Sequence, residues 1–298
     1  MNNLNYAREY EEYLGQAFPN VLRFGALYAT PNNGRFRYAG GKKVEIPVIT
    51  VSGRTANDRD SVPTLARNYE NSWDTKSLSH ERKWSTLVHP ADIDQTAGAA
   101  AIQNITKVFN EEQKFPEMDA YTISKLYADY TDEGETPTRV TLTSSNVLST
   151  FDTLMDAMTE KNVPEHGRIL YVTPAVMSLI RTAAGSGRIQ TTSGIDRTVT
   201  SLDGVEVCVV PSALFKTAYD FTSGYEPEDY AEQISMLLIH PEAVITPVSY
   251  EYSCLDEPTA ATGGKYVYYE ESHEDVFILS NRIDGVAFVL PPATPGND

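Results

Sequence analysis

Cysteine and histidine are scarce in this 298-residue chain, which contains two cysteines and five histidines. Cys208 lies in VEVCVV, an almost continuous apolar segment, so we predict a buried small hydrophobe, neither half of a disulfide nor a nucleophile. The histidines are scattered, and none forms the i, i+4 pair with an intervening Glu that a metalloprotease helix needs. These shortages argue against a disulfide framework and a zinc protease.

Long apolar runs are also missing. No stretch approaches the roughly 18 apolar residues that span a bilayer, and the N-terminus MNNLNYAREYEEY has neither the basic start nor the apolar run of a signal peptide. We therefore expect a chain that is made in a cytoplasm and does not enter a membrane. Its hydrophobic content of 41% is sufficient for one large domain or two of ordinary size.

Basic residues are outnumbered, and the formal charge is −17. Residues 219–298 contain 15 acidic and two basic side chains and so carry −13, whereas the other 218 residues carry −4. A chain this acidic repels a phosphate backbone. We therefore expect no specific binding of nucleic acid.

Signatures of catalysis are absent or weak. The Gly-Ser-Gly at 185–187 follows a predicted helix and lacks the Lys of a phosphate-binding loop, and no Gly-x-Ser-x-Gly elbow occurs. Asp92 and Asp94 could bind a divalent ion, but helix capping explains them more simply. Residues 273–275 (HED) are interpreted as the polar end of a strand. We predict no catalytic residue, no metal and no cofactor, and a soluble enzyme is the least favoured function.

The region from residue 40 to residue 90 is the most informative part of the chain. Residues 44–51 and 84–88 are predicted strands, and residues 52–71 between them are polar. Ordering about twenty residues costs on the order of 20–40 kcal/mol, since each fixed backbone costs about 1–2 kcal/mol. Offsetting the lower figure needs roughly 800 Å² of apolar burial, which Val62, Leu65 and Tyr69 cannot supply. Either this loop is disordered or a neighbouring molecule holds it, and we favour the second.

The same region is mildly basic, with eight basic and six acidic residues between 42 and 83. A basic loop on an acidic body could attract copies of the same chain to each other. The alternative is that these charges only keep the surface soluble. We predict inter-subunit contacts through Arg54, Arg59, Arg67, Lys76, Arg82 and Lys83.

Periodicity predicts an α+β fold. Helices are predicted at 4–18, 91–110 (capped by Asp92 or Asp94), 117–130 (starting at Pro116), 147–158 (capped by Ser144 or Ser145) and 174–183. Strands are predicted at 169–172, 205–210, 234–239, 245–252, 266–270, 276–280 and 286–290. The alternation in the middle third implies a sheet covered by helices.

The order of these parts and their local wording resemble a known family. The segments TAGAAAIQNITKVFNEEQKF, PEMDAYTISKLY, ILYVTPAVMSLI, LDGVEVCVVPSALF, MLLIHPEAVITPVSYEY and YYEESHEDVFILSNRIDGV are similar to the major capsid proteins of tailed bacteriophages, which have the Hong Kong 97 type fold. The resemblance implies an N-terminal arm and first peripheral segment at 1–39, an extended loop at 40–90 that lies over an adjacent subunit, peripheral spine helices at 91–130, an axial domain at 131–231, and peripheral strands and the C-terminus at 232–298.

The resemblance also implies a function. The chain would self-assemble into hexamers and pentamers of an icosahedral or prolate head in the virion, enclosing double-stranded DNA without binding it specifically. A portal protein is an implied partner, and a decoration protein is possible. Only about thirty residues precede the loop, so a separate scaffolding protein is expected. Crosslinking is not expected, because no Asn and catalytic Glu stand out to match Lys42, Lys43, Lys76 or Lys83. An encapsulin-like nanocompartment shell is the alternative.

Net charge gives the first testable prediction. An acidic lining would not adhere to packaged DNA, but packing many copies of a −17 chain brings like charges together, and this repulsion is screened over roughly 8 Å at physiological salt. We expect assembly of purified subunits to weaken at low ionic strength. Light scattering at low and moderate salt measures this, and equal assembly in both would contradict the argument.

Overall fold

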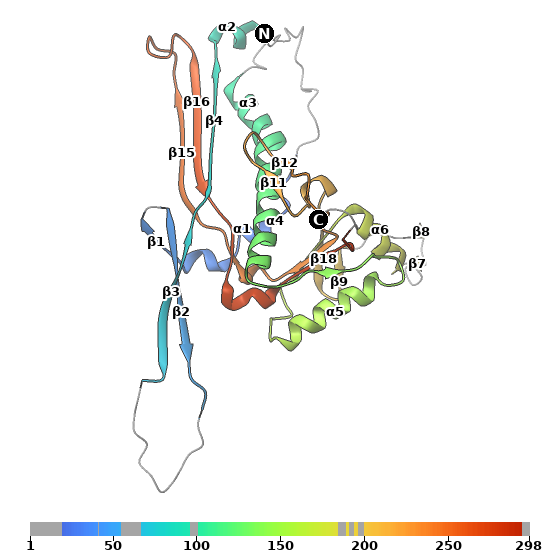
Figure 1. The fold of residues 1–298 in the computed structure, drawn as a ribbon. Coiled ribbons are helices and arrows are strands. Elements are labelled where there is room, and N and C mark those ends of the chain that lie inside the picture. Colours follow the sequence, from blue (N-terminus) through green and yellow to red (C-terminus); the bar gives the residue numbers. More distant parts are fainter. Residues whose placement is uncertain are drawn as a thin grey trace.

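A computed structural model describes residues 20–40, 42–54, 67–95, 101–183, 189–190, 194–195 and 200–293. The helix predicted at 4–18, Arg59 and the Gly-Ser-Gly at 185–187 lie outside the described residues. The described chain is an α+β body from which two long β projections extend in opposite directions (Figure 1).

One long helix runs beside the body, and we call it the spine. It consists of α3 (Ile102–Phe109), a π turn η2 (Asn110–Lys114) and α4 (Phe115–Asp132). The prediction that a separate helix starts at Pro116 is wrong, because the spine continues through this residue. A proline ring inside a regular α-helix would clash with the carbonyl of Glu112. The π turn, in which the Phe115 N–H donates to the Asn110 carbonyl, changes the hydrogen-bond pattern at this point and keeps the helix continuous.

A short helix, α2 (Pro90–Gln95), precedes the spine. The prediction of a cap at Asp92 or Asp94 is wrong, since the helix begins at Pro90 and Asp92 lies in its first turn. Residues 96–100 lie outside the described part, so the predicted single helix over 91–110 is seen only as α2 and α3.

The body is built on a six-stranded sheet in the order β5-β18-β13-β6-β10-β9. Its strands are β5 (Thr138–Arg139), β6 (Ile169–Val172), β9 (Ser201–Leu202), β10 (Val205–Val209), β13 (Met236–Ile239) and β18 (Val286–Leu290). β13 pairs antiparallel with both β6 and β18, and β10 runs parallel to β6. The sheet therefore joins strands from both sides of residue 231, where the sequence predicts a domain boundary.

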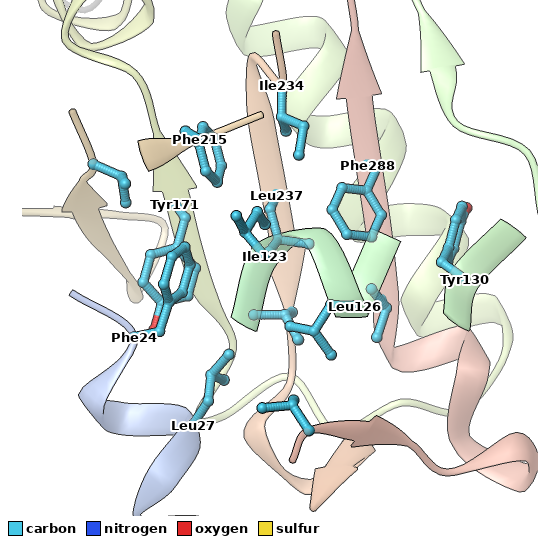
Figure 2. Packing of buried hydrophobic residues seen from close by; sticks show 14 of the residues in the cluster. Phe24, Leu27, Ile123, Leu126, Tyr130, Tyr171, Phe215, Ile234, Leu237 and Phe288 are labelled. Atoms are coloured by element: carbon cyan, nitrogen blue, oxygen red, sulfur yellow. The ribbon is translucent and has the colours of Figure 1, made fainter. Parts of the chain in front are cut away.

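One face of this sheet packs against α4 and the short helix α1 (Gly25–Tyr28). Alternate side chains of β6 point to this face, where Tyr171 lies 4.6 Å from Phe24 between ring centroids. Figure 2 shows Ile123 and Leu126 of α4 beside Leu237 and Phe288 of the sheet. All of these side chains are buried, so this cluster is the larger part of the core.

The other face is covered by α5 (Val147–Glu160) and α6 (Pro174–Ala183). Leu170 and Val172 of β6 point to this side and pack with Phe151. Both helices and the one-sided stripe predicted for α5 are confirmed. The predicted cap at Ser144 or Ser145 is wrong, because the helix follows Asn146, whose Oδ1 accepts a hydrogen bond from the Thr143 N–H at 2.7 Å.

The remaining elements complete the sheets and connections. The strands are β1 (Arg37–Gly40), β2 (Lys43–Val51), β3 (Tyr69–Ser77), β4 (His80–Val88), β7 (Ile189–Gln190), β8 (Gly194–Ile195), β11 (Tyr219–Asp220), β12 (Glu226–Pro227), β14 (Val244–Ile245), β15 (Val248–Asp256), β16 (Tyr266–Glu274) and β17 (Phe277–Ile278). The 3-10 turns are η1 (Pro31–Gly34), η4 (Ser212–Leu214), η5 (Pro241–Ala243) and η6 (Ser280–Gly285). The strand predicted at 245–252 is divided into β14 and β15 around Pro247.

Both cysteines, Cys208 and Cys254, are free thiols, and each is half-buried.

A buried carboxylate fixes the first described segment to the spine. Asp119 of α4 accepts hydrogen bonds from the N–H groups of Arg23, at 3.0 and 2.9 Å, and of Phe24, at 3.1 Å. Burial raises the pKa of Asp119 from its ordinary 3.8 to about 6, although these N–H groups oppose the shift.

This shift predicts a pH dependence. A carboxyl whose pKa is raised on folding favours the folded state in its protonated form. Its full contribution to stability is present below the unfolded pKa and is lost as the pH rises through the folded pKa. For Asp119 this loss falls between about pH 4 and pH 6. We expect wild-type chain to lose stability in this window, and Asp119→Asn to lose less by about 2–3 kcal/mol. Urea unfolding of both proteins at pH 4 and pH 7 measures the difference. Parallel pH profiles would contradict the assignment.

Candidate inter-subunit interface

The first projection is the hairpin of β2 and β3. These strands pair antiparallel from Lys43 with Ser77 to Val51 with Tyr69. At the base, Val44 and Ile46 are buried against Leu78, Ile245, Phe277 and Leu279 of the body. Beyond Ile46 the hairpin leaves the body, and an isolated two-stranded hairpin is marginally stable in water.

Large apolar side chains are exposed on the outer half of the hairpin. Ile49 is 65% exposed, Val51 74%, Tyr69 53% and Trp73 43%. The register pairs Ile49 with Asn71 and Val51 with Tyr69, so these residues share one face with Trp73, which lies opposite Pro47. Exposed apolar clusters of this kind mark protein–protein contacts.

The hairpin has two faces, and the exposed apolar side chains lie on the face that does not contact the body. Val44 and Ile46 have even numbers and lie on one side of β2, whereas Ile49 and Val51 have odd numbers and lie on the other. The hairpin therefore contacts its own body with one face and offers the other face to a different molecule.

Two arginines lie over the aromatic rings of the hairpin. The Arg37 guanidinium lies 3.8 Å from the centroid of the Trp73 ring, and the Arg67 guanidinium lies 4.6 Å from that of Tyr69. Arg37 also forms an ion pair with Glu45 at 2.7 Å. The charge of Arg37 is thus balanced by Glu45, whereas Arg67 places a positive charge next to the apolar surface of the outer half.

The second projection is the three-stranded sheet β15-β16-β4, which we call the projecting sheet (Figure 1). The strand predicted at 84–88 is confirmed, but it begins at His80 and pairs with β16, from Tyr266 opposite Val88 to Glu274 opposite His80. The predicted two-stranded loop of 44–51 and 84–88 is therefore wrong. The strand that pairs with β2 is β3, which was not predicted because its sequence YENSWDTKS is mostly polar.

The projecting sheet is fixed to the spine on one face. Trp84 of β4 stacks on Phe109 of α3 with ring centroids 4.0 Å apart and planes 8° apart. The opposite face has Leu87 59% exposed and Tyr252 45% exposed, next to Tyr269. This second apolar surface is also available to a neighbouring molecule.

A buried carboxylate joins both projections to the spine. Asp275 accepts hydrogen bonds from the Ser79 N–H at 2.8 Å, from the Ser79 hydroxyl at 3.1 Å and from the Tyr121 hydroxyl at 2.7 Å. Ser79 lies between β3 and β4, and Tyr121 belongs to α4. His80 stacks on Tyr121 at 3.7 Å, and burial lowers the pKa of His80 to about 4, so His80 is neutral at pH 7.

Charged groups line a cavity of about 720 Å³ between the projecting sheet and the spine. Arg82 forms an ion pair with Glu117 and donates to the Phe221 carbonyl at 2.6 Å. Burial raises the pKa of Glu274 to about 6. Within the described residues, no three His, Cys, Asp or Glu side chains are arranged to hold a metal ion. The cavity is lined by internal ion pairs of the fold.

The predicted contact residues are divided between these surfaces. Arg54 and Arg67 are exposed on the outer half of the hairpin, and Lys83 is exposed on the projecting sheet. Lys76 is turned toward the body, with Asp74 at 3.6 Å and Glu133 at 3.7 Å. Lys76 and Arg82 are thus engaged within their own chain, and Arg59 lies outside the described part.

Charge counting missed the exposed apolar residues of the hairpin. Ile49, Val51 and Trp73 are absent from the predicted set. In residues 47–51 (PVITV), Ile49 and Val51 lie on the face of the strand opposite to Val44 and Ile46. The sequence indicates that this face is exposed only once Val44 and Ile46 are known to be buried.

None of the helices in the described part of the chain is long and apolar enough to cross a membrane.

Comparison with known proteins identifies the fold. No family model matches the sequence, and no curated protein matches it. The capsid structure of cyanophage P-SCSP1u is similar with a TM-score of 0.67 and 13% identity over 97% of this chain and 94% of that one. A Mycobacterium phage Che8 chain gives 0.63 and 16% over 97% and 98%. The capsid of a native GTA particle gives 0.58 and 11% over 96% and 95%. The predicted Hong Kong 97 type capsid fold is confirmed.

The hydrogen bonds of Asp275 give a stability prediction. Asp275→Ala leaves the buried Tyr121 hydroxyl without its nearest acceptor, at a cost of about 1–3 kcal/mol, and also removes the hydrogen bonds from the exposed Ser79. Tyr121→Phe removes the 2.7 Å hydrogen bond to Asp275 and a long 3.5 Å contact with the Ser79 hydroxyl, and is expected to cost about 1 kcal/mol. Urea unfolding measures both, with Ser280→Ala, on an exposed hydroxyl, as control. Equal losses in the two variants would contradict the central role of Asp275.

Proposed function

We propose that this chain is the major capsid protein of a tailed-phage type particle, a structural protein that assembles with copies of itself into the head shell. The observation that carries the proposal is the outer half of the hairpin, whose apolar face stays largely exposed within the described chain although Arg37 and Arg67 lie over two of its rings. A neighbouring copy supplies that cover. The similarity of the fold to phage and GTA particle capsids over nearly the full chain supports this.

The energetics favour burial of the hairpin between copies. Burying an aliphatic or aromatic side chain such as Ile49 contributes roughly 1.5–3 kcal/mol. Because Ile49, Val51, Tyr69 and Trp73 lie on one face, a single flat contact buries all of them. Arg54 and Arg67 then lie beside the contact, where they meet the acidic surface of the neighbour.

The assembly has further proposed features. Copies form hexamers and pentamers of an icosahedral or prolate head, with residues 131–231 as the axial domain. Within residues 40–90, the hairpin of β2 and β3 is the extended loop, because β4 belongs to the projecting sheet. A portal protein, a separate scaffolding protein and a decoration protein are its proposed partners. The net charge of −17 supports a wall that encloses DNA without adhering to it.

The two faces of the hairpin provide the test. Ile49→Asp with Val51→Asp places two charges on the exposed apolar face, and desolvating them in an interface is costly. Thr50→Asp with Ser72→Asp places two charges on the other face of the same hairpin and is the matched control. We expect the first variant to stay folded but form no particles, and the control to form particles.

Electron microscopy of both variants and of wild-type chain, expressed with the neighbouring genes, measures assembly, and circular dichroism checks folding. Particles from the Ile49→Asp, Val51→Asp variant would refute the proposed interface. Wild-type particles that enclose protein cargo in place of DNA would favour the encapsulin-like alternative.

A further inference from the structure

The cavity of about 720 Å³ between the projecting sheet and the spine is lined by more acidic than basic side chains. Six glutamates and three basic residues form its charged lining, so the lining carries −3 when all of these groups are ionised. Four of the glutamates have a partner within the chain, in the pairs Glu81–Lys42, Glu117–Arg82, Glu270–Lys114 and Glu271–Tyr269. The two that remain are Glu251 and Glu274.

Glu274 is the buried member of these two. It is only 9% exposed, yet within the described chain its carboxylate accepts no hydrogen bond and forms no ion pair. Arg82 and Lys114 belong to the pairs above. Lys83 lies opposite Glu271, on the outer face of the sheet. Burying a carboxylate without a donor is costly, so this wall of the cavity lacks a positively charged group.

Glu251 lies beside Glu274 on the same face of the projecting sheet. The register pairs Glu251 of β15 with Ser272 of β16, and Ser272 and Glu274 point to the same side because they are two residues apart. Glu251 is exposed, so it lies at the rim of the cavity, whereas Glu274 lies inside. Two carboxylates without a cation therefore face the spine together.

The spine adds an acceptor and an apolar surface farther along the same cavity. The side-chain Oδ1 of Asn110 is buried and has no hydrogen-bond partner in the described chain. Asn110 and Glu117 are seven residues apart, which is roughly 10 Å along a helix. Next to Asn110, the rings of Trp84, Phe109 and Tyr268 line the cavity. The cavity is thus acidic at one end and aromatic at the other.

We propose that this cavity binds a linear organic cation, whose primary ammonium group is held by the carboxylates of Glu274 and Glu251 and whose carbon chain lies along the spine toward Trp84. An ammonium group has three donors, which match unpaired carboxylate oxygens, and methylene groups pack well on aromatic rings. A metal ion fits less well, because no three His, Cys, Asp or Glu side chains in the described residues are arranged to hold one.

Protonation of Glu274 would compete with the cation. Charged or titratable groups face Glu274 from each element around it, namely Glu117 and Lys114 of the spine, Glu251 of β15, His80 and Arg82 of β4, and Asp275. Burial, together with the neighbouring carboxylates, raises the pKa of Glu274 to about 6 against the opposing effect of Lys114. The cation therefore meets an ionised Glu274 above pH 6 and a neutral one below it.

Titration calorimetry of full-length, unassembled chain tests the site. The probe is cadaverine, a linear diamine, and pentanediol of the same length is its uncharged control, both at constant ionic strength. We expect cadaverine to bind wild-type chain at least about tenfold more tightly than Glu274→Gln, because the variant loses a charge-assisted hydrogen bond. Glu160→Gln removes a charge from an exposed position on α5 and should bind like wild type.

Two results would overturn the proposal. These are cadaverine binding of equal strength in wild-type chain and in folded Glu274→Gln, and no cadaverine binding to wild-type chain. Circular dichroism checks that the variant is folded. Because unassembled chain is used, failure here leaves the proposed capsid function standing.

The pH dependence provides a second readout. With a folded pKa of about 6, binding to wild-type chain should weaken about tenfold from pH 7.5 to pH 5, and binding to Glu274→Gln should not change. Parallel pH profiles in the two proteins would contradict the role of Glu274.

Assembled particles distinguish two sources of the same chemistry. Cadaverine binding to particles as well as to unassembled chain would assign the site to a free amine. Binding to unassembled chain alone would assign it to a lysine side chain of a neighbouring copy.

Discussion

The structure depends on the apolar side chains that the outer half of the β2–β3 hairpin leaves exposed. The hairpin of β2 and β3 is fixed to the body at its base through Val44 and Ile46, and beyond that point it exposes Ile49, Val51, Tyr69 and Trp73 on the opposite face. Apolar surface of this kind is stable in water only when another molecule covers it. The face that is covered inside the chain and the face that is left for a neighbour are separated by the two-residue period of a strand.

Rigid support makes such a projection useful. The spine contacts the sheet through α4, and its carboxylates and aromatic rings hold the segments around it. Asp119 binds the backbone at Arg23 and Phe24, and Asp275, bonded to Tyr121, binds the backbone between the two projections at Ser79. Both projections are therefore oriented by the same helix. A subunit that must contact its neighbours at fixed angles needs this rigidity, because flexible arms would lose entropy at every contact.

Periodicity in the sequence predicted the parts of the fold whose burial is decided locally. The stripe of α5 and the continuous apolar runs of β6, β13 and β18 were recognisable, because these elements bury a whole face or both faces. β3 was not, because Tyr69 and Trp73 are its only large apolar residues and none of its side chains is buried in the described chain. The helix break expected at Pro116 failed for another reason, since a π turn in the preceding residues accommodates the ring. The sequence could not show that Lys76 and Arg82 form ion pairs within their own chain, because their partners Glu133 and Glu117 are distant in sequence.

Amide exchange in the hairpin tests the central claim most directly. It should be compared between unassembled chain and assembled particles, over residues 48–51 and 69–73. If a neighbouring copy completes this element, these amides exchange rapidly in the isolated chain and become strongly protected in the particle, while those of β13 are protected in both. Strong protection of the outer hairpin in the isolated, monomeric chain would contradict the account.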